Sequence, residues 1–459
     1  MNRRNLLLRG DLKIGIWGVG HIGYSTMCHF AERGVSIVGF DIDVEKAAAV
    51  NRGESAIFAM DYWLGFSPGY LFKSGQARVT TDWEEMMDPE ISVHFICIPT
   101  ERHGQPWLEP LMDVCRKLAA MKDRPRSMPP LVIIESTLTP TTTDQHIIPF
   151  FEQEGIELGK DLLLGCAPRR DWFSSPDKSL TTLPRIFGGM DDATAEQMHQ
   201  VLSIVCQNLV KAPTHFYAEV VKSIENAYRH TEIALAFELS RAYPNMDMRT
   251  VLELVGTKWN VGTFHPSFGV GGYCIPLSSY YVIEGAEKPE ELNILRQAIA
   301  TCEDQPELLA QSLIQRGVRK VGILGLSYTE NVKVWAQSPT LALSAVLAKV
   351  GIGVKVHDPN FTAEEIYKIA GTDTFDFPDD LDEFDAVLLV AGHREYRLSN
   401  HRDILPHLSN CRLVLDNSGF WKEVDFDSKG IEYFVPGNAH WMNGVGSETA
   451  SLPTAPVGD

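Results

Sequence analysis

The chain has 459 residues, which is too long for one hydrophobic core and predicts two or three domains. The net charge of −19 disfavours nucleic acid as a partner, because an acidic protein is repelled by a phosphate backbone. No apolar run approaches the roughly 18 residues of a membrane span, so we expect no membrane association. The apolar part of the opening MNRRNLLLRGDLK is too short for a signal peptide, which predicts a cytoplasmic protein with a short disordered leader.

The first part of the chain alternates strand-like and helix-like stretches. Residues 13–17, KIGIW, end at a glycine turn, a helical pattern follows, and residues 35–41 form a second strand-like run. This order is the opening of a parallel α/β sheet. Further strand-like runs stand at 94–99, 131–136 and 162–168. We predict a first domain over 1–213.

The middle of the chain is predicted to be helical. Residues 215–243 contain no proline and are typical of one long helix, of the kind that often crosses between domains. We therefore predict a central helical domain over 214–316. Strand-like runs restart at residue 320, which predicts a second parallel α/β domain over 317–436. The remaining residues, 437–459, are rich in Gly, Ser, Thr and Pro and are predicted to be a disordered tail.

A glycine motif follows the first predicted strand. Gly18, Gly20 and Gly23 form G-x-G-x-x-G, and Asp41 ends the next strand-like run, which together predict a Rossmann-like dinucleotide site. The glycines let the backbone approach a pyrophosphate, and the helix start offers free N–H groups. Asp41 would accept hydrogen bonds from an adenine ribose and repel a 2′-phosphate, which favours NAD over NADP and leaves FAD open. The rest of the predicted cofactor loop is Val19, His21 and Ile22.

A second glycine turn, GILGLS at 322–327, precedes the third domain's first predicted helix. Its spacing is G-x-x-G, without a third glycine. Two interpretations stay open for it, a nucleotide-binding turn and a tight turn that only joins a strand to a helix.

One cysteine, Cys274, follows a run of glycines in GVGGYCIP. Glycines there allow backbone conformations that would bring the thiol close to a ligand. The eight cysteines form no C-x-x-C pair and no zinc spacing with histidine, so we expect no metal. Lys222 and Asn226 are four residues apart on the long helix and share one face. A lysine near a thiol favours the reactive thiolate, although a packing cysteine and a solvated lysine remain the alternative.

A nicotinamide cofactor and a nucleophilic cysteine together suggest one chemistry. An alcohol is oxidised to an aldehyde, the thiol adds to give a thiohemiacetal, and a second oxidation gives a thioester that water opens to an acid.

These motifs resemble the UDP-glucose/GDP-mannose dehydrogenase family over about residues 12–435. The matching segments are IGIWGVGHIG, CIPTE, ESTLTPTTT, VVKSIENAYRHTEIALAFEL and GVGGYCIP, in the family's order. The resemblance implies an NAD domain, a central dimerisation domain and a nucleotide-sugar domain, in a homodimer that oxidises a nucleotide-sugar or related sugar.

The resemblance also implies residue roles. Cys274 would be the nucleophile, and Lys222 and Asn226 would stabilise the oxyanion and help to position water. Thr137 would hold the catalytic water, and Thr100 and Thr137 would lie near the nicotinamide.

Two positions depart from the family pattern near these residues. Ser278 and Arg169 stand where the family usually has an aspartate and a glutamate, and neither is a good general base. Arg169 would favour the thiolate, bind an anion of the substrate, or form a structural salt bridge. The predicted substrate-binding residues are Arg169, Lys222, Asn226, Gly271 and Ser278.

The third domain departs too. YTENVKVWAQSP at 328–339 has Thr329 and Ala336 where the family has a lysine and an arginine, and Ser418 replaces a further arginine. Lys333 would supply one of the lost positive charges, although its side chain starts from a different position in the sequence. The two lost acids, at Ser278 and Arg169, leave open a single-step dehydrogenase that gives an aldehyde. The lost acids and the altered third domain together leave open a catalytically silent nucleotide-sugar-binding protein.

Overall fold

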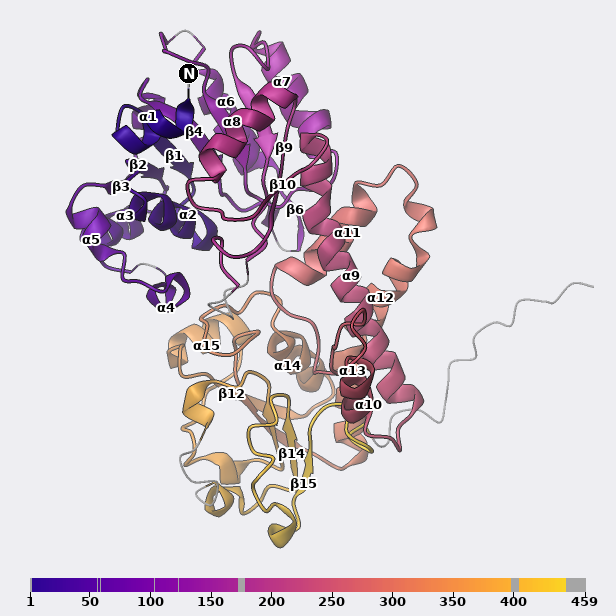
Figure 1. Ribbon diagram of the computed structural model, residues 1–459. Coiled ribbons are helices and arrows are strands. Elements are labelled where there is room, and N and C mark those ends of the chain that lie inside the picture. Colours follow the sequence, from indigo (N-terminus) through magenta and orange to yellow (C-terminus); the bar gives the residue numbers. More distant parts are fainter. Residues whose placement is uncertain are drawn as a thin grey trace, which may run out of the picture. The chain divides into compact units, whose positions relative to one another are not determined.

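The computed structural model describes residues 2–55, 57, 59–102, 104–122, 124–171, 178–397 and 404–442. It divides into two compact units, one of Met1–Ala227 with Leu277–Leu292 and one of Tyr228–Pro276 with Asn293–Asp459 (Figure 1). The central segment is therefore shared between the two units. The domain boundaries predicted at residues 213, 316 and 436 come from sequence patterns, not from contacts in the fold, and they stay predictions.

The first unit is built on an eight-stranded sheet in the order β10-β9-β8-β7-β4-β1-β2-β3. Its strands are parallel to their neighbours except β8 and β9, which pair antiparallel. The five strands predicted here from the sequence, β1, β2, β4, β7 and β8, are confirmed. The bounds are β1 Lys13–Trp17, β2 Ile37–Phe40, β3 Ala77–Thr80, β4 Ile91–Ile96, β7 Leu131–Ile134, β8 Leu163–Cys166, β9 Arg185–Gly189 and β10 Leu209–Lys211.

Both faces of this sheet are buried. Along β7, Leu131 and Ile133 lie in one hydrophobic cluster, whereas Val132 and Ile134 lie in another, as the two-residue period of a strand requires. The helices of this unit are α1 Arg3–Arg9, α2 His21–Glu32, α3 Val44–Asn51, α4 Met60–Leu64, α5 Gly69–Lys73, α6 Glu109–Ala119, α7 Ile148–Gln153 and α8 Asp192–Leu202. Short elements are the hairpin β5 Glu101–Arg102 and β6 Gln105–Pro106, the 3₁₀ helices Trp83–Met87 and Pro289–Glu291, and the π-helical turn Thr143–Ile147.

The prediction of a disordered leader is wrong for residues 3–9. They form α1, and the side chain of Asn2 caps its start by accepting a hydrogen bond from the backbone N–H of Asn5. Arg3 is buried, and its guanidinium donates to the carbonyl oxygens of Ser92 and Pro129. Burial lowers the pKa of Arg3 to about 10. The two carbonyl oxygens accept hydrogen bonds from the buried guanidinium and fix α1 to the sheet.

The second unit contains a five-stranded parallel sheet in the order β12-β11-β13-β14-β15. Its strands are β11 Lys320–Leu324, β12 Gly353–His357, β13 Ala386–Leu389, β14 Leu413–Asp416 and β15 Glu432–Phe434. Its helices are α10 Met248–Val255, α12 Asn293–Glu303, α13 Gln305–Gln315, α14 Pro339–Lys349 and α15 Ala363–Ala370. Its 3₁₀ helices are Leu381–Glu383, Arg394–Tyr396, Leu405–Leu408 and Asp427–Lys429. The predicted α/β class with two parallel-sheet domains is confirmed.

The predicted tail is ordered at its start. Trp441 and Met442 are buried in the core of the second unit, so the prediction of disorder is wrong for residues 437–442. The rest of the predicted tail, 443–459, lies outside the described residues.

Two helices contribute residues to both units. The predicted long helix is confirmed as α9, His215–Ala242, the magenta helix labelled in Figure 1. The other is α11, Cys274–Glu284. Within the described ranges no helix is long and apolar enough to span a membrane, and no cluster of His, Cys, Asp and Glu could hold a metal ion.

Candidate active site

The glycine loop after β1 has the geometry of a phosphate cradle. Gly18 has a φ of +88°, and a Cβ on Gly23 would lie 1.9 Å from the carbonyl oxygen of Gly18, so only glycine fits at Gly23. A Cβ on Gly20 would meet nothing within 4 Å. Gly20 is the N-cap of α2, and His21 and Ile22 are the first residues of this helix. The loop therefore packs closely on its inner side and leaves open backbone where a dinucleotide pyrophosphate would lie.

Asp41 lies against this loop. Its Oδ2 accepts the backbone N–H of Val19 at 2.9 Å and the ammonium of Lys46 at 3.1 Å, and its Oδ1 accepts the N–H of Asp43 at 3.0 Å. A carboxylate offers about four acceptor positions, which leaves about one for a ribose hydroxyl. The residues present therefore fit an NAD adenosine, with Asp41 tying the loop to the end of β2.

Thr100 and Thr137 lie together at the same edge of the sheet. They follow β4 and β7, which are adjacent parallel strands, and β1 is the next neighbour of β4. The hydroxyl of Thr100 donates to the carbonyl oxygen of Thr137 at 2.6 Å. The hydroxyl of Tyr281 donates to the carbonyl oxygen of Thr100 at 3.0 Å. The loops after these three strands therefore share one edge, where ligands of α/β sheets bind.

Asn226 and Ser278 form a buried pair in the same unit. The side-chain amide of Asn226 donates to the hydroxyl oxygen of Ser278 at 2.9 Å. On the same helix, Ser223 donates to the carbonyl oxygen of Leu138, which ties α9 to the segment after β7. Ser278 and Tyr281 are one turn apart on α11, so this helix connects Asn226 with the Thr100 loop. The sequence did not indicate Tyr281, although its spacing of three from Ser278 is the signal that would have found it.

Lys222 lies one turn before Asn226 on α9 and is half-buried. Among the residues that the structure describes, its ammonium has no hydrogen-bond or ion-pair partner. A half-buried ammonium without an internal partner is available to an anionic or polar ligand.

Cys274 is the first residue of α11 and belongs to the second unit, as does Gly271. Its thiol is exposed, whereas the other seven cysteines are buried. The free N–H groups at the start of a helix carry a positive partial charge, and Cys274 lies at that end of α11. Of the eight cysteines, Cys274 is the one that is exposed to solvent.

Arg169 is buried and fully occupied by structural partners. Its Nε and Nη2 donate to the carboxylate of Asp171 at 2.7 and 2.5 Å, and Nη2 also reaches Ser25. Its Nη1 donates to Thr26 at 2.6 Å and to the carbonyl oxygen of Ile22 at 3.4 Å. All five donors of the guanidinium are used. This geometry favours the structural salt bridge over a substrate anion as the role of Arg169.

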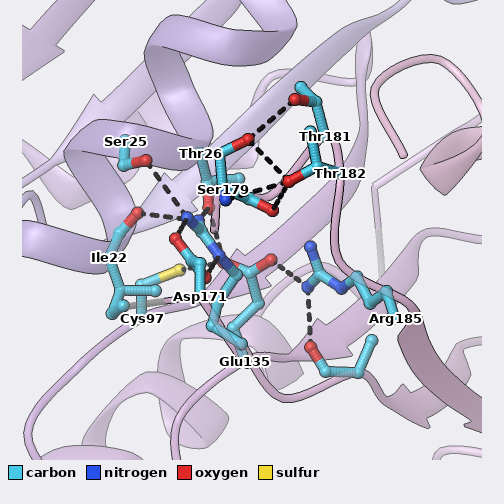
Figure 2. Close-up of polar contacts among 12 residues, drawn as sticks. Ile22, Ser25, Thr26, Cys97, Glu135, Asp171, Ser179, Thr181, Thr182 and Arg185 are labelled. Carbon is cyan, nitrogen blue, oxygen red and sulfur yellow. Dashed lines mark hydrogen bonds and ion pairs between the residues drawn. The ribbon is translucent and has the colours of Figure 1, made fainter. Parts of the chain in front are cut away.

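A buried carboxylate, Glu135, adjoins this ion pair (Figure 2). It accepts from the hydroxyl of Thr26 at 2.7 Å and the thiol of Cys97 at 3.1 Å, and it forms an ion pair with Arg185. Arg185 also donates to the carbonyl oxygen of Ala167 at 2.6 Å. Burial, together with the nearby Glu135, raises the pKa of Cys97, so this thiol stays protonated. The network joins α2 to β4, β7 and β9 and fixes the helix that begins at the glycine loop.

The third domain's glycine turn is held by a carboxylate. Asp358 accepts the backbone N–H groups of Leu326 and Ser327 at 2.8 and 2.9 Å, and it pairs with His393 at 3.0 Å. These N–H groups are therefore used inside the protein, which favours the tight-turn interpretation of GILGLS.

The altered basic positions of this domain are also accounted for. Lys333 forms an ion pair with Glu365 at 2.8 Å, so its charge is compensated within the domain. Ala336 is buried, Thr329 is half-buried, and the backbone N–H of Ser418 donates to Asp416 at 2.9 Å.

Comparison with known proteins identifies the family. Three models of the UDP-glucose/GDP-mannose dehydrogenase family match the chain: its NAD binding domain over residues 12–205, its central domain over 217–303 and its UDP binding domain over 322–423. The chain belongs to the UDP-glucose/GDP-mannose dehydrogenase family. It is an NAD-dependent dehydrogenase, and the resemblance inferred from the motifs is confirmed.

The relatives of this dehydrogenase are distant but span nearly its whole length. It is 26% identical over 436 residues to UDP-N-acetyl-D-mannosamine dehydrogenase from Pyrococcus horikoshii, covering 92% of this chain and 99% of the relative. It is 26% identical over 401 residues to UDP-N-acetyl-D-glucosamine 6-dehydrogenase from Pseudomonas aeruginosa, covering 84% and 92%. The solved structure of UDP-D-ManNAc dehydrogenase from Pyrococcus horikoshii matches with a TM-score of 0.80, covering 94% of this chain and all of that one.

Proposed function

We propose that this dehydrogenase oxidises the primary alcohol of a UDP-linked sugar to a carboxylic acid, with Cys274 carrying the sugar. The observation that carries the proposal is the exposed thiol of Cys274 at the start of α11, in a chain that matches all three domains of the family. The names of the relatives make a UDP-linked N-acetylhexosamine the first substrate to test.

NAD⁺ held at the glycine loop would supply the oxidant for two successive oxidations, with one NAD⁺ molecule consumed in each. Between them, the thiolate of Cys274 adds to the carbon of the aldehyde, a C–S bond forms, and the alkoxide oxygen takes up a proton. After the second oxidation the sugar is held as a thioester. Attack of water then breaks the C–S bond, releases the acid and returns the thiol.

The other roles follow from position. We assign Lys222 and Asn226 to stabilising the oxyanion, because the ammonium of Lys222 has no partner among the described residues. We assign Thr100 and Thr137, at the edge of the sheet beside the glycine loop, to the nicotinamide side and Thr137 also to holding water. Gly271 and Ser278 stay predicted substrate-binding residues.

A single-step dehydrogenase that releases an aldehyde is the second candidate. Ser278 and Arg169 supply no general base, because one is a hydroxyl bound to Asn226 and the other a guanidinium paired with Asp171. Thioester hydrolysis is the step that would suffer from this.

The test is turnover with NAD⁺ and a panel of UDP-N-acetylmannosamine, UDP-N-acetylglucosamine, UDP-glucose and GDP-mannose. We expect two NADH per acid product with one UDP-sugar and a covalent sugar adduct in the intact mass. The Cys274→Ser variant should lose the adduct and the acid. One NADH per aldehyde would support the second candidate, and no NADH with any sugar would overturn both.

We also propose a homodimer formed through α9. Tyr217, Ile224, Tyr228 and Leu235 are exposed and stand seven, four and seven residues apart, which places them on one stripe of the helix. Exposed aromatic stripes of this kind are usually covered by a partner. Sedimentation of the wild type should give a dimer, and Tyr228→Lys should shift it toward the monomer. A monomeric wild type would overturn this proposal.

A further inference from the structure

The turn before Cys274 is fixed by the loop that follows β11. The backbone N–H of Gly272 donates to the carbonyl oxygen of Ala336 at 2.9 Å. A Cβ on Gly271 would lie 2.7 Å from the Cβ of Tyr328. Gly269 and Gly272 have φ values of +151° and +83°, which side chains rarely allow. Both segments belong to the second unit, so this contact is internal to it.

Tyr328 lies directly on this turn. A Cβ on Gly272 would come within 2.9 Å of its Cε2 atom and 3.1 Å of its Cζ atom, the atom that carries the hydroxyl. The side of the ring that carries Cε2 and Cζ therefore lies against Gly272, two residues before Cys274, while the Cβ of Tyr328 faces Gly271. A side chain at Gly272 would displace the ring, which explains the glycine physically.

The charges around Tyr328 agree with this placement. Burial raises the pKa of Tyr328 to about 12, the negative charge of Cys274 adds to this rise, and Arg229 on α9 opposes it. The phenol therefore stays protonated over the range in which a thiol ionises, and it is available there as a hydrogen-bond donor.

We propose that Tyr328 is a positioning residue for Cys274, whose phenol O–H stabilises the thiolate and whose ring holds the glycine turn. The catalytic meaning of this role rests on the proposed function, but thiolate stabilisation does not. A loop of the third domain would thereby tune the reactivity of the nucleophile in the same unit.

The test uses the pH dependence of Cys274 alkylation by iodoacetamide, followed by intact mass. Because the other seven cysteines are buried, native protein should gain one adduct. We expect Tyr328→Phe, which keeps the ring, to move the alkylation midpoint to higher pH. If the midpoint rises by about one pH unit, the alkylation rate at neutral pH should fall about tenfold. Tyr328→Leu removes both the hydroxyl and the ring, so its alkylation rate should differ from that of the wild type by more than the rate of Tyr328→Phe does.

Tyr367→Phe is the matched control, because Tyr367 is exposed on α15 of the same unit and should leave the midpoint unchanged. Thermal unfolding verifies that each variant is folded. Equal midpoints for wild type and Tyr328→Phe would overturn the inference. The alkylation test uses no substrate, so it is independent of the proposed function. If no sugar yields NADH but Tyr328→Phe still raises the midpoint, the proposed function is contradicted and the inference about Tyr328 stands.

Discussion

The side-chain amide of Asn226 on α9 donates a 2.9 Å hydrogen bond to the hydroxyl of Ser278 on α11, and both residues are almost fully buried. Ser278 stands where the resemblance to the family implies an aspartate. A hydroxyl can accept this bond as a carboxylate would, but it brings no negative charge to the site. The pair therefore holds the amide of Asn226 in place without offering a carboxylate for proton transfer.

Removing the acceptor of this pair should destabilise the first unit. Ser278→Ala leaves the buried amide of Asn226 without this partner, and we expect a loss of about 1–3 kcal/mol in the free energy of unfolding. Urea unfolding measures this loss. Ser278→Thr, which keeps the hydroxyl acceptor with little added volume, should lose less, and equal losses for both variants would show that the hydrogen bond is not the cause.

Asp41 should control NAD affinity through the glycine loop. Asp41→Ala removes the acceptor of the Val19 and Asp43 N–H groups together with the proposed ribose acceptor. We expect NAD binding to weaken at least tenfold, measured by calorimetry. Lys46→Met removes only the ion pair and should have a smaller effect. Unchanged affinity in Asp41→Ala would contradict the assigned cofactor geometry.

The Arg169–Asp171 ion pair should be a strong structural element. Arg169→Met leaves the buried carboxylate of Asp171 unpaired, which typically costs about 3–5 kcal/mol. The double variant Arg169→Met with Asp171→Leu should recover much of this loss in urea unfolding. If Arg169 instead binds a substrate anion, the single variant would keep its stability and raise KM.

Glu219 on α9 should make stability depend on pH. Burial raises its pKa from 4.5 to about 7, although the backbone N–H and hydroxyl of Thr143 oppose the rise. The folded state therefore binds more protons than the unfolded state between about pH 4.5 and 7. Its stabilising contribution is complete below pH 4.5 and is lost as pH rises toward 7, by up to about 3 kcal/mol.

The Glu219→Gln variant removes this contribution, and Asp144 is a nearby carboxylate whose charge also acts on Glu219. Urea unfolding at pH 5 and pH 8 should show a smaller fall in stability with pH for the variant than for the wild type. Parallel pH profiles would mean that Glu219 titrates alike in the folded and unfolded states.

Local sequence patterns determined much of this protein. The apolar runs predicted β1, β4, β7 and β8 because strands buried on both faces consist of continuous apolar residues. The glycine spacing predicted the cofactor loop because only glycine fits at Gly23, and the proline-free segment predicted α9. Each of these signals lies within a few neighbouring residues, and the family motifs extended them to the assignment of Cys274.

Only the tertiary structure decided which distant side chains meet. Arg169 reaches Thr26, Arg185 reaches Glu135, and Tyr281 reaches Thr100 because the order of strands in the sheet and the return of α11 bring them together. The burial of Arg3 and Trp441 likewise depends on the surface that each end of the chain meets. The residues next to a single arginine or tyrosine in the sequence do not predict its partner, because the partner depends on packing between distant parts of the chain.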